Sequence, residues 1–301
     1  MRLKEIHSSD LTASCPKFVE LRLKGMTRPA ATTALYRGLV AGESMRLLHE
    51  RHIHGGTEPA LYSMLVSEAA AIVDATLAAE GRLKTPAVEA SMSDVVTDVA
   101  SACEKYWMKL QPRMSKWTLL GCEVPVRWKY APRYPEFASH IDCLLRDENG
   151  GLVVIDWKWK AESPTYQYLA RNMQMACYYA CCFEGRFLLN DGLSTEWVSL
   201  CEEPRMVWLQ LPALLPFGRK TRCEDDKGME VEFSRGDDRP IRMAWKEIEY
   251  GHLPSTVDDI RAALMQRARM FKNDIFPQNP DPVGCTICEA ESFCKRFDTI
   301  V

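Results

Sequence analysis

Residues 139–160 read SHIDCLLRDENGGLVVIDWKWK, and this stretch decides how the centre of the chain folds. Two apolar runs flank Asn149-Gly150, a dipeptide that favours the tight turn of a β-hairpin. Folding the chain about residue 149 sets Asp142 roughly opposite Asp156. Asp156 and Lys158 are two residues apart, so both side chains point to the same face of a strand. The sequence therefore predicts two carboxylates and one ammonium group at one place on a sheet.

This constellation has the residue types of a metal-dependent hydrolytic site. Mg²⁺ and Mn²⁺ prefer oxygen ligands and keep several waters, so Asp142, Asp156 and the main-chain carbonyl of Trp157 are candidate ligands. Lys158 would orient or polarise an attacking water, or offset charge on a scissile phosphate. The alternative interpretation is an exposed hairpin that carries scattered charges.

A second pattern lies at the two ends of the chain. Cys285, Cys288 and Cys294 have the spacing C-x₂-C-x₅-C, and Cys15 stands alone near the N-terminus. Four thiolates suit either an iron–sulfur cluster or structural zinc, if the fold brings the chain ends together. Zinc ribbons usually show two C-x₂-C pairs, and the single pair here favours iron–sulfur. A loop with reduced cysteines is the alternative.

These features together resemble the RecB/AddB-type branch of the PD-(D/E)xK nuclease superfamily, above all its iron–sulfur members, which include CRISPR-adaptation nucleases and phage exonucleases. The matching pieces occur in the family's order over most of the chain. They are Ser14-Cys15-Pro16-Lys17-Phe18, Ile141-Asp142, Ile155-Asp156-Trp157-Lys158, the Q-x-x-x-Y helix Gln174-Met175-Ala176-Cys177-Tyr178, Phe276-Pro277, Pro280, and the cysteines Cys285, Cys288 and Cys294.

The resemblance implies an α/β, restriction-endonuclease-like fold with a central mixed sheet flanked by helices. It implies one nuclease domain over residues 1–301, in which residues 11–28 and 274–301 form a small helical lobe around a [4Fe-4S] cluster. The implied activity is Mg²⁺- or Mn²⁺-dependent hydrolysis of DNA ends or single strands, in recombination, repair or phage DNA processing. Asp142, Asp156, Lys158, Gln174 and Tyr178 are the implied catalytic residues, and protein partners in a recombination or adaptation complex are a further expectation.

The third side-chain ligand of the metal departs from the family pattern. Many relatives carry a histidine in a G-x-x-x-H pattern on an early helix, but here Gly38 is followed by Gly42, and Gly42 by Arg46. His49, on the same helix, and Glu43 are the substitutes that the sequence offers. An ordinary surface or core histidine is the other interpretation of His49.

Composition agrees with a globular DNA-processing protein of the cytoplasm. The chain of 301 residues can bury a large core, and no run of 18 apolar residues predicts a membrane span. Cysteines lie within apolar segments, where they are expected to be reduced core thiols rather than a disulfide framework: Cys143, Cys177, Cys181 and Cys182. The net charge of −3 neither indicates nor excludes a nucleic-acid partner, because local basic patches decide phosphate contact.

Aromatic residues near the aspartates are candidates for stacking on the bases of a single strand, with core packing as the alternative for each. They are Trp157, Trp159, Tyr166 and Tyr168.

The pattern of apolar residues predicts helices over 11–26, 32–54, 59–80, 91–110, 164–183 and 256–273. Strands are expected over 118–128, 137–146 and 151–160, with further antiparallel strands over 195–212 and 228–245 and a loop over 218–228.

Two rival functions compete with a nuclease. A nucleic-acid-binding protein of the same fold without catalysis is one, because the family histidine is missing. A zinc-stabilised interaction module built on the four terminal cysteines is the other.

Overall fold

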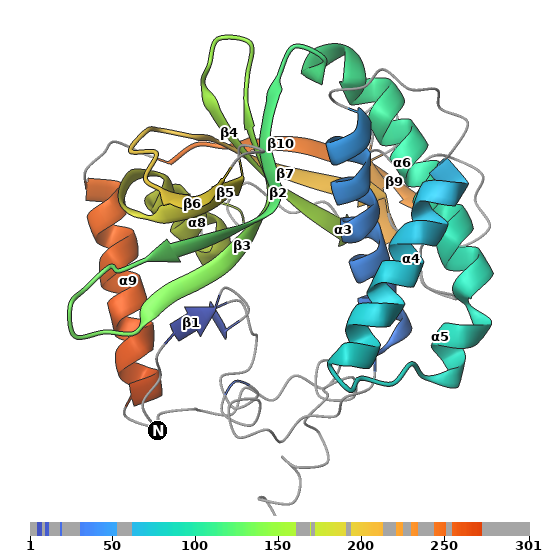
Figure 1. Ribbon diagram of the computed structural model, residues 1–301, viewed down its shortest axis with the longest axis horizontal. Coiled ribbons are helices and arrows are strands. Elements are labelled where there is room, and N and C mark those ends of the chain that lie inside the picture. Colours follow the sequence, from blue (N-terminus) through green and yellow to red (C-terminus); the bar gives the residue numbers. More distant parts are fainter. Residues whose placement is uncertain are drawn as a thin grey trace, which may run out of the picture.

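A mixed sheet of eight strands forms the middle of the computed structural model (Figure 1). Along the sheet the order is β10-β7-β4-β3-β2-β5-β6, and β1 pairs with β3. The β4–β7 and β1–β3 pairs are parallel and the others antiparallel. The strands are β1 (Glu5–His7), β2 (Thr118–Trp128), β3 (Glu136–Arg146), β4 (Leu152–Lys160), β5 (Arg186–Asn190), β6 (Thr195–Val198), β7 (Arg205–Pro212) and β10 (Ala244–Ile248).

The structure describes part of the chain, and every statement below refers to that part. The described residues are 5–7, 10–11, 19, 31–52, 62–160, 169, 172–190, 194–212, 221–224, 230–233, 244–250 and 255–272. The four terminal cysteines of the expected cluster, and with them nearly all of the lobe over 11–28 and 274–301, lie outside these residues.

The hairpin β3–β4 forms in the register that its turn predicts. Arg146 pairs with Leu152 and Cys143 with Ile155. Gly150 adopts φ 82°, which glycine tolerates without strain. The Asp147 side chain accepts hydrogen bonds from the backbone nitrogens of Asn149 and Gly151, at 2.9 Å each. The turn residues therefore set which side chains of the two strands lie opposite one another.

One face of the sheet is covered by α3 (Thr33–His52), α4 (Tyr62–Ala79) and α6 (Met92–Met114), with the short α5 (Pro86–Ala90) between the last two (Figure 1). The odd residues 153, 155 and 157 of β4 pack against this layer. By length and apolar composition alone α4 is able to cross a membrane. One side of α4 is buried against α3 and α6, as in a core helix.

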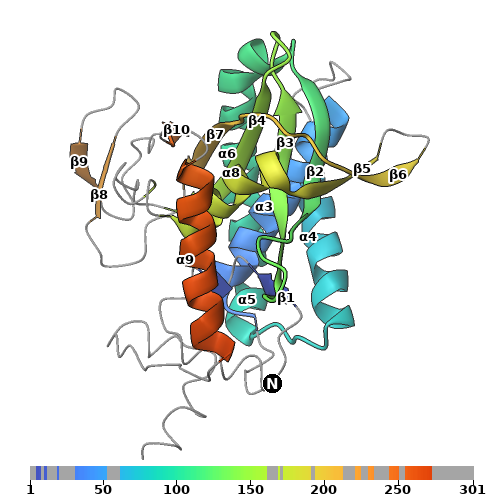
Figure 2. The ribbon, with the colours of Figure 1, turned by 90° about the vertical axis from the view of Figure 1, so that its left-hand side faces the viewer.

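The other face is covered by α8 (Met173–Glu184) and α9 (Ser255–Lys272), which are seen in front of the sheet in Figure 2. Residues 152 and 154 of β4 contribute to the core on this side. Because both faces are covered, β4 is apolar from residue 152 to residue 155, and the charged residues at 156, 158 and 160 follow in its second half.

Most expected elements are confirmed. The strands over 118–128, 137–146 and 151–160 and the helices over 32–54, 59–80 and 256–273 match observed elements within a few residues. The expectation of a central mixed sheet flanked by helices is confirmed as well. The expected core thiols at 143, 177, 181 and 182 are buried and not in disulfides.

Several boundaries were wrong. The helix expected to end before Pro112 continues to Met114, because a proline in the last turn removes only one hydrogen bond there. Helix α8 begins at Met173, where the Asn172 side chain caps it, rather than at 164. The expected strand over 195–212 is two strands, β5 was not anticipated, and a small hairpin of β8 (Thr221–Glu224) and β9 (Glu230–Phe233) begins inside the expected loop.

Candidate active site

Asp142, Asp156 and Lys158 meet where β3 and β4 lie side by side. Continuing the β3–β4 register by one residue sets Asp142 opposite Asp156. The Trp157 backbone nitrogen donates a hydrogen bond of 2.7 Å to Oδ2 of Asp142. The Lys158 Nζ lies 2.6 Å from Oδ2 of the fully buried Asp156. The hairpin thus brings the three charged groups together as the sequence predicts.

The charges in this cluster perturb one another. Removal from water and the neighbouring Asp156 carboxylate raise the pKa of Asp142 well above its ordinary value, although Lys158 acts in the opposite direction. Burial alone would lower the pKa of Lys158, but the carboxylates of Asp156 and Asp142 outweigh it, so this pKa is raised. Lys158 is therefore a cation at neutral pH, whereas the raised pKa of Asp142 favours the protonated, neutral form of this acid.

Glu123 on β2 is a third acid of the site. Cys122 pairs with Cys143 and Val124 with Ile141, so Glu123 lies across from Asp142 on the neighbouring strand. Glu123 has φ 48°, a backbone conformation that residues other than glycine seldom adopt and that is often found at functional sites. Glu123 is exposed at the surface, but partial withdrawal of its carboxyl group from water and the charge of Glu43 raise its pKa. Three acids therefore stand in a row on the adjacent strands β2, β3 and β4.

Glu123 carried no functional role in the sequence interpretation. The only signal for it in the sequence is an acid in the middle of a strand that is otherwise largely apolar. The unusual backbone angle that turns its side chain toward Asp142 is visible only in the folded chain.

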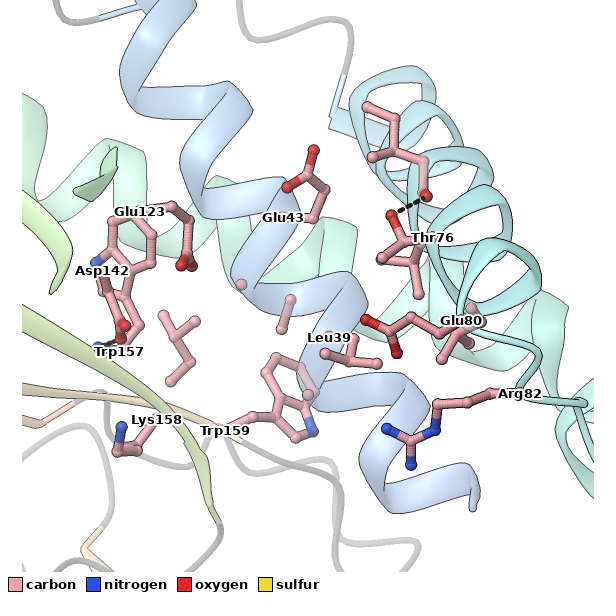
Figure 3. Close-up of a pocket in the computed structure, with 17 residues that line it drawn as sticks. Leu39, Glu43, Thr76, Glu80, Arg82, Glu123, Asp142, Trp157, Lys158 and Trp159 are labelled. Carbon is pink, nitrogen blue, oxygen red and sulfur yellow. Dashed lines mark hydrogen bonds between the residues drawn. The ribbon is translucent and has the colours of Figure 1, made fainter. Parts of the chain in front are cut away.

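Helix α3 supplies Glu43 from the opposite wall (Figure 3). Its carboxylate accepts hydrogen bonds from Nε and Nη2 of Arg46, at 2.9 and 2.5 Å. Arg46 also donates to Glu50, at 2.5 Å. Glu43 thus faces the site while a guanidinium holds it from its own helix.

His49 lies in the core and not at the cavity. Its side chain is completely buried, Nε2 is 2.6 Å from the hydroxyl of Tyr106, and Nδ1 is 3.7 Å from Sγ of Cys143. The ring also packs against the indole of Trp157, with 5.3 Å between centroids. Burial lowers the pKa of His49 to about 3. Both ring nitrogens therefore face Tyr106 and Cys143, in agreement with the core interpretation of this histidine.

Gln174 and Tyr178 lie on α8 behind β3. The Gln174 amide donates to the hydroxyl of Tyr178 at 2.8 Å, and this hydroxyl donates to the carbonyl oxygen of His140 at 2.6 Å. Ser139 Oγ is 3.1 Å from the same hydroxyl. The pair thus reaches the backbone of β3 two residues before Asp142, rather than the cavity itself.

A cavity of about 480 Å³ opens from the acids toward α4 (Figure 3). Glu123, Asp142 and Lys158 line the end of it that lies against the sheet, here called the inner end. Glu43 and Leu39 of α3 and Trp159 of β4 line its middle, while Thr76, Glu80 and Arg82 lie toward α4. The charged groups therefore stand at one end of a space large enough for a small ligand.

The inner end of the cavity fits a hydrated divalent cation. Among the described residues no cluster of three His, Cys, Asp or Glu side chains forms a ready-made metal site. Mg²⁺ nevertheless keeps several waters and needs only one or two carboxylates. Asp142 and Asp156 provide hard oxygen donors, and a cation bound there would favour the ionised form of Asp142, whose pKa is raised by burial and by the charge of Asp156.

The family model of the PD-(D/E)XK nuclease superfamily matches residues 11–295 of the chain. No curated protein gives a significant match. The match covers every strand and helix that builds the site, together with the segments that carry Cys15, Cys285, Cys288 and Cys294.

Proposed function

The chain belongs to the PD-(D/E)XK nuclease superfamily, and we propose that it is a DNA nuclease that hydrolyses phosphodiester bonds at strand ends with Mg²⁺ or Mn²⁺. The superfamily makes it a metal-dependent nuclease that acts on nucleic acid. The observation that supports the proposal most is that Asp142 and Lys158 line one end of a cavity and that Asp156 is buried directly beside them. The finer parts of the proposal are that the substrate is DNA and that it is attacked at strand ends. They also include a role in recombination, repair or phage DNA processing, in the cytoplasm and with protein partners.

Asp142 and Asp156 would hold the metal, with the main-chain carbonyl of Trp157 as a further ligand. The bound metal would lower the pKa of a water and offset the charge that develops on the phosphate. The two acids beside Lys158 raise its pKa, which favours the role of a cation over that of a general base. It would hold the scissile phosphate and stabilise the negative charge of the transition state.

Glu123 and Glu43 are the best candidates for the third side-chain ligand. Glu123 is already across from Asp142, and both lie at the same end of the cavity. Glu43 would first have to release Arg46. His49 is the weakest candidate, because both its ring nitrogens face core residues on the far side of Trp157.

Gln174 and Tyr178 would act on catalysis by positioning Asp142. The hydrogen bond from Tyr178 to His140 holds the backbone of β3 next to the site, and the Gln174 amide orients that hydroxyl. We expect Tyr178→Phe to lower kcat with little effect on the affinity for metal.

End-labelled linear DNA and circular DNA, single- and double-stranded, test the proposed activity. Each is incubated with Mg²⁺, with Mn²⁺ or with EDTA. We expect linear DNA to be shortened from its ends with either metal, and no cleavage in EDTA. The variant Asp142→Asn/Asp156→Asn should be inactive but folded. If that variant cuts at the wild-type rate, the site is wrong; if no DNA is cut under any condition, the chain is a binding protein of this fold.

The [4Fe-4S] cluster is a separate part of the proposal, carried by Cys15, Cys285, Cys288 and Cys294. A shared cluster would tie residues 11–28 to residues 274–301 as a lobe of one nuclease domain. Iron and sulfide are measured in protein purified without oxygen. The variant Cys15→Ala should lose iron as fully as Cys288→Ala. Cys177 is buried and free, so Cys177→Ala serves as the control and should keep its iron. Stoichiometric zinc without sulfide would favour the structural zinc site instead.

A further inference from the structure

We propose that the part of the cavity between α3, α4 and the end of β4 is a slot for one unpaired nucleotide next to the scissile phosphate. The proposal rests on the nuclease function above and names its substrate as a single strand. The slot is defined by Gly38, Gly42, Leu39, Trp159 and Arg82.

Two glycines of α3 keep the slot open. Gly38 and Gly42 are one helical turn apart and both line the cavity. A Cβ built on either residue would meet no atom within 4 Å. Each glycine also costs the helix stability, since glycine is a poor helix former. The two glycines therefore leave empty space directly opposite β4, where larger residues would be accepted by the fold.

Trp159 supplies an aromatic surface on the other side of this space. Its indole lies beside Leu39 and points toward α3 (Figure 3). Lys158 points to the other face of β4 but also lines the cavity, so a base resting on Trp159 would share the cavity with a phosphate held by Lys158. Stacking on an aromatic side chain is how proteins hold the bases of single strands without reading their sequence.

The far rim of the slot is polar and carries charges of both signs. Arg82 points back toward Trp159, and Glu80 and Thr76 lie beside it on the α4 side (Figure 3). The Thr76 hydroxyl donates to the carbonyl of Ile72. Arg82 is thus the only cation at this rim among the described residues that line the cavity, and it suits one phosphate rather than a long backbone.

The size of the slot favours an unpaired strand. Asp142 and Glu123 lie at one end of a cavity of about 480 Å³, and Trp159 and Arg82 line the same cavity. A nucleotide that occupies the slot lies between α3 and β4, where there is room for one base and not for a base pair. A nucleotide in a duplex is stacked and paired, so its entry requires local unpairing, which costs free energy. A free single strand avoids that cost.

Gly38→Leu tests the slot by filling it. The added side chain enters open space, so the variant should fold and melt no lower than wild type. Its affinity for a labelled single-stranded oligonucleotide in EDTA, measured by fluorescence anisotropy, should fall at least about fivefold, as expected for overfilling a packed site. Cleavage in Mg²⁺ should fall with it. Ala71→Leu is the matched control, because Ala71 is exposed on α4 and lies outside the cavity.

Trp159→Ala tests the stacking surface in the same assay. Loss of one stacked base should weaken binding of the single strand by about fivefold to about a hundredfold, and Trp159→Phe should recover most of it. Trp197→Ala is the control, because Trp197 is an exposed tryptophan on β6. Arg82→Gln should lower the slope of log K against log salt by about 0.7, the value for one phosphate of a single strand.

The outcomes separate the slot from the proposed nuclease. If Gly38→Leu binds and cuts single strands as wild type does, or if Trp159→Ala binds them with unchanged affinity, the slot is disproved while the nuclease stands. Equal losses on single- and double-stranded DNA would also overturn it, since the slot predicts a loss confined to unpaired strands. If the wild-type protein cuts no DNA, the proposed nuclease activity is wrong. The binding assays in EDTA still test the slot in that case.

Discussion

Asp142 and Cys143 are neighbours in β3, yet they belong to polar clusters of opposite character. Asp142 lines the end of a cavity beside the ion pair of Asp156 and Lys158. Cys143 joins His49 and Tyr106 in the core. There burial raises the pKa of Tyr106 and lowers that of His49, so all three groups are neutral.

The difference shows that the partners of a buried group decide its charge. His49 has no carboxylate among its contacts, and desolvation removes its proton. Lys158 is also withdrawn from water, but two carboxylates hold its proton in place. The Asp156–Lys158 pair therefore keeps its charges inside the fold, whereas His49 is kept neutral. Four predictions test this division.

The largest effect is expected for Lys158→Gln. Loss of a cation from the phosphate site should lower kcat about 10²- to 10³-fold, as for other groups that stabilise transition-state charge. The affinity for Mn²⁺ should change little, because the carboxylates remain. Single-turnover cleavage and a metal titration measure the two quantities. Lys116→Gln, an exposed change before β2, is the control. A variant with normal kcat would show that Lys158 only neutralises Asp156.

Metal should stabilise the charged cluster and leave the neutral one untouched. At a Mg²⁺ concentration 100 times Kd, the free energy of unfolding should rise by about 2.7 kcal/mol. The rise should vanish in Asp142→Asn and persist in Tyr106→Phe. Thermal or urea unfolding with and without Mg²⁺ measures it. Loss of the rise in Tyr106→Phe would place His49 back among the metal ligands.

Tyr106→Phe should cost stability and not activity. The change removes the hydroxyl that lies 2.6 Å from Nε2 of His49 and leaves a buried nitrogen without its partner. We expect the free energy of unfolding to fall by about 1–3 kcal/mol. The value of kcat should stay at the wild-type level wherever the protein is folded. Urea unfolding and a cleavage assay on the same preparation check both parts, and a large loss of kcat would contradict the division.

The smallest effect is the pH dependence that His49 contributes. In the folded protein its pKa is about 3, whereas an unfolded histidine has about 6.5. Below pH about 6.5 His49 binds a proton in the unfolded chain but not in the folded protein. The free energy of unfolding therefore falls as the pH drops toward 3. The slope is at most about 1.4 kcal/mol per pH unit. In His49→Gln, the free energy of unfolding from urea titrations should depend less steeply on pH between pH 6.5 and 4. An unchanged slope would mean that other groups cause the pH dependence.

Local patterns predicted the core of the site well. The alternation in β4 and the Asn149-Gly150 turn act over a few residues, and they place Asp142, Asp156 and Lys158 together without reference to the rest of the chain. The same local signals predicted most helices and the three central strands. They were less reliable at helix ends and in short edge strands, where capping by Asn172 and pairing with distant strands decide the bounds.

Distant contacts decided the rest of the site. His49 and Glu43 lie on the same helix, and the sequence offers both as ligands. Only the packing of α3 on the sheet turns His49 toward Tyr106 and Glu43 toward the cavity. Gln174 and Tyr178 are likewise four residues apart in the sequence, but the fold directs them to the backbone of β3.

By itself, the sequence determined the hairpin, its register and the charged pair on β4, because turn chemistry and the two-residue period of a strand are local properties. The tertiary structure decided that Glu123 completes the row of acids, that His49 is sealed in the core, and that α3 and α4 leave a cavity beside Trp159. Those outcomes depend on how segments far apart in the chain pack together and exclude water. Burial by such packing sets the charge of a side chain and determines which groups it can contact.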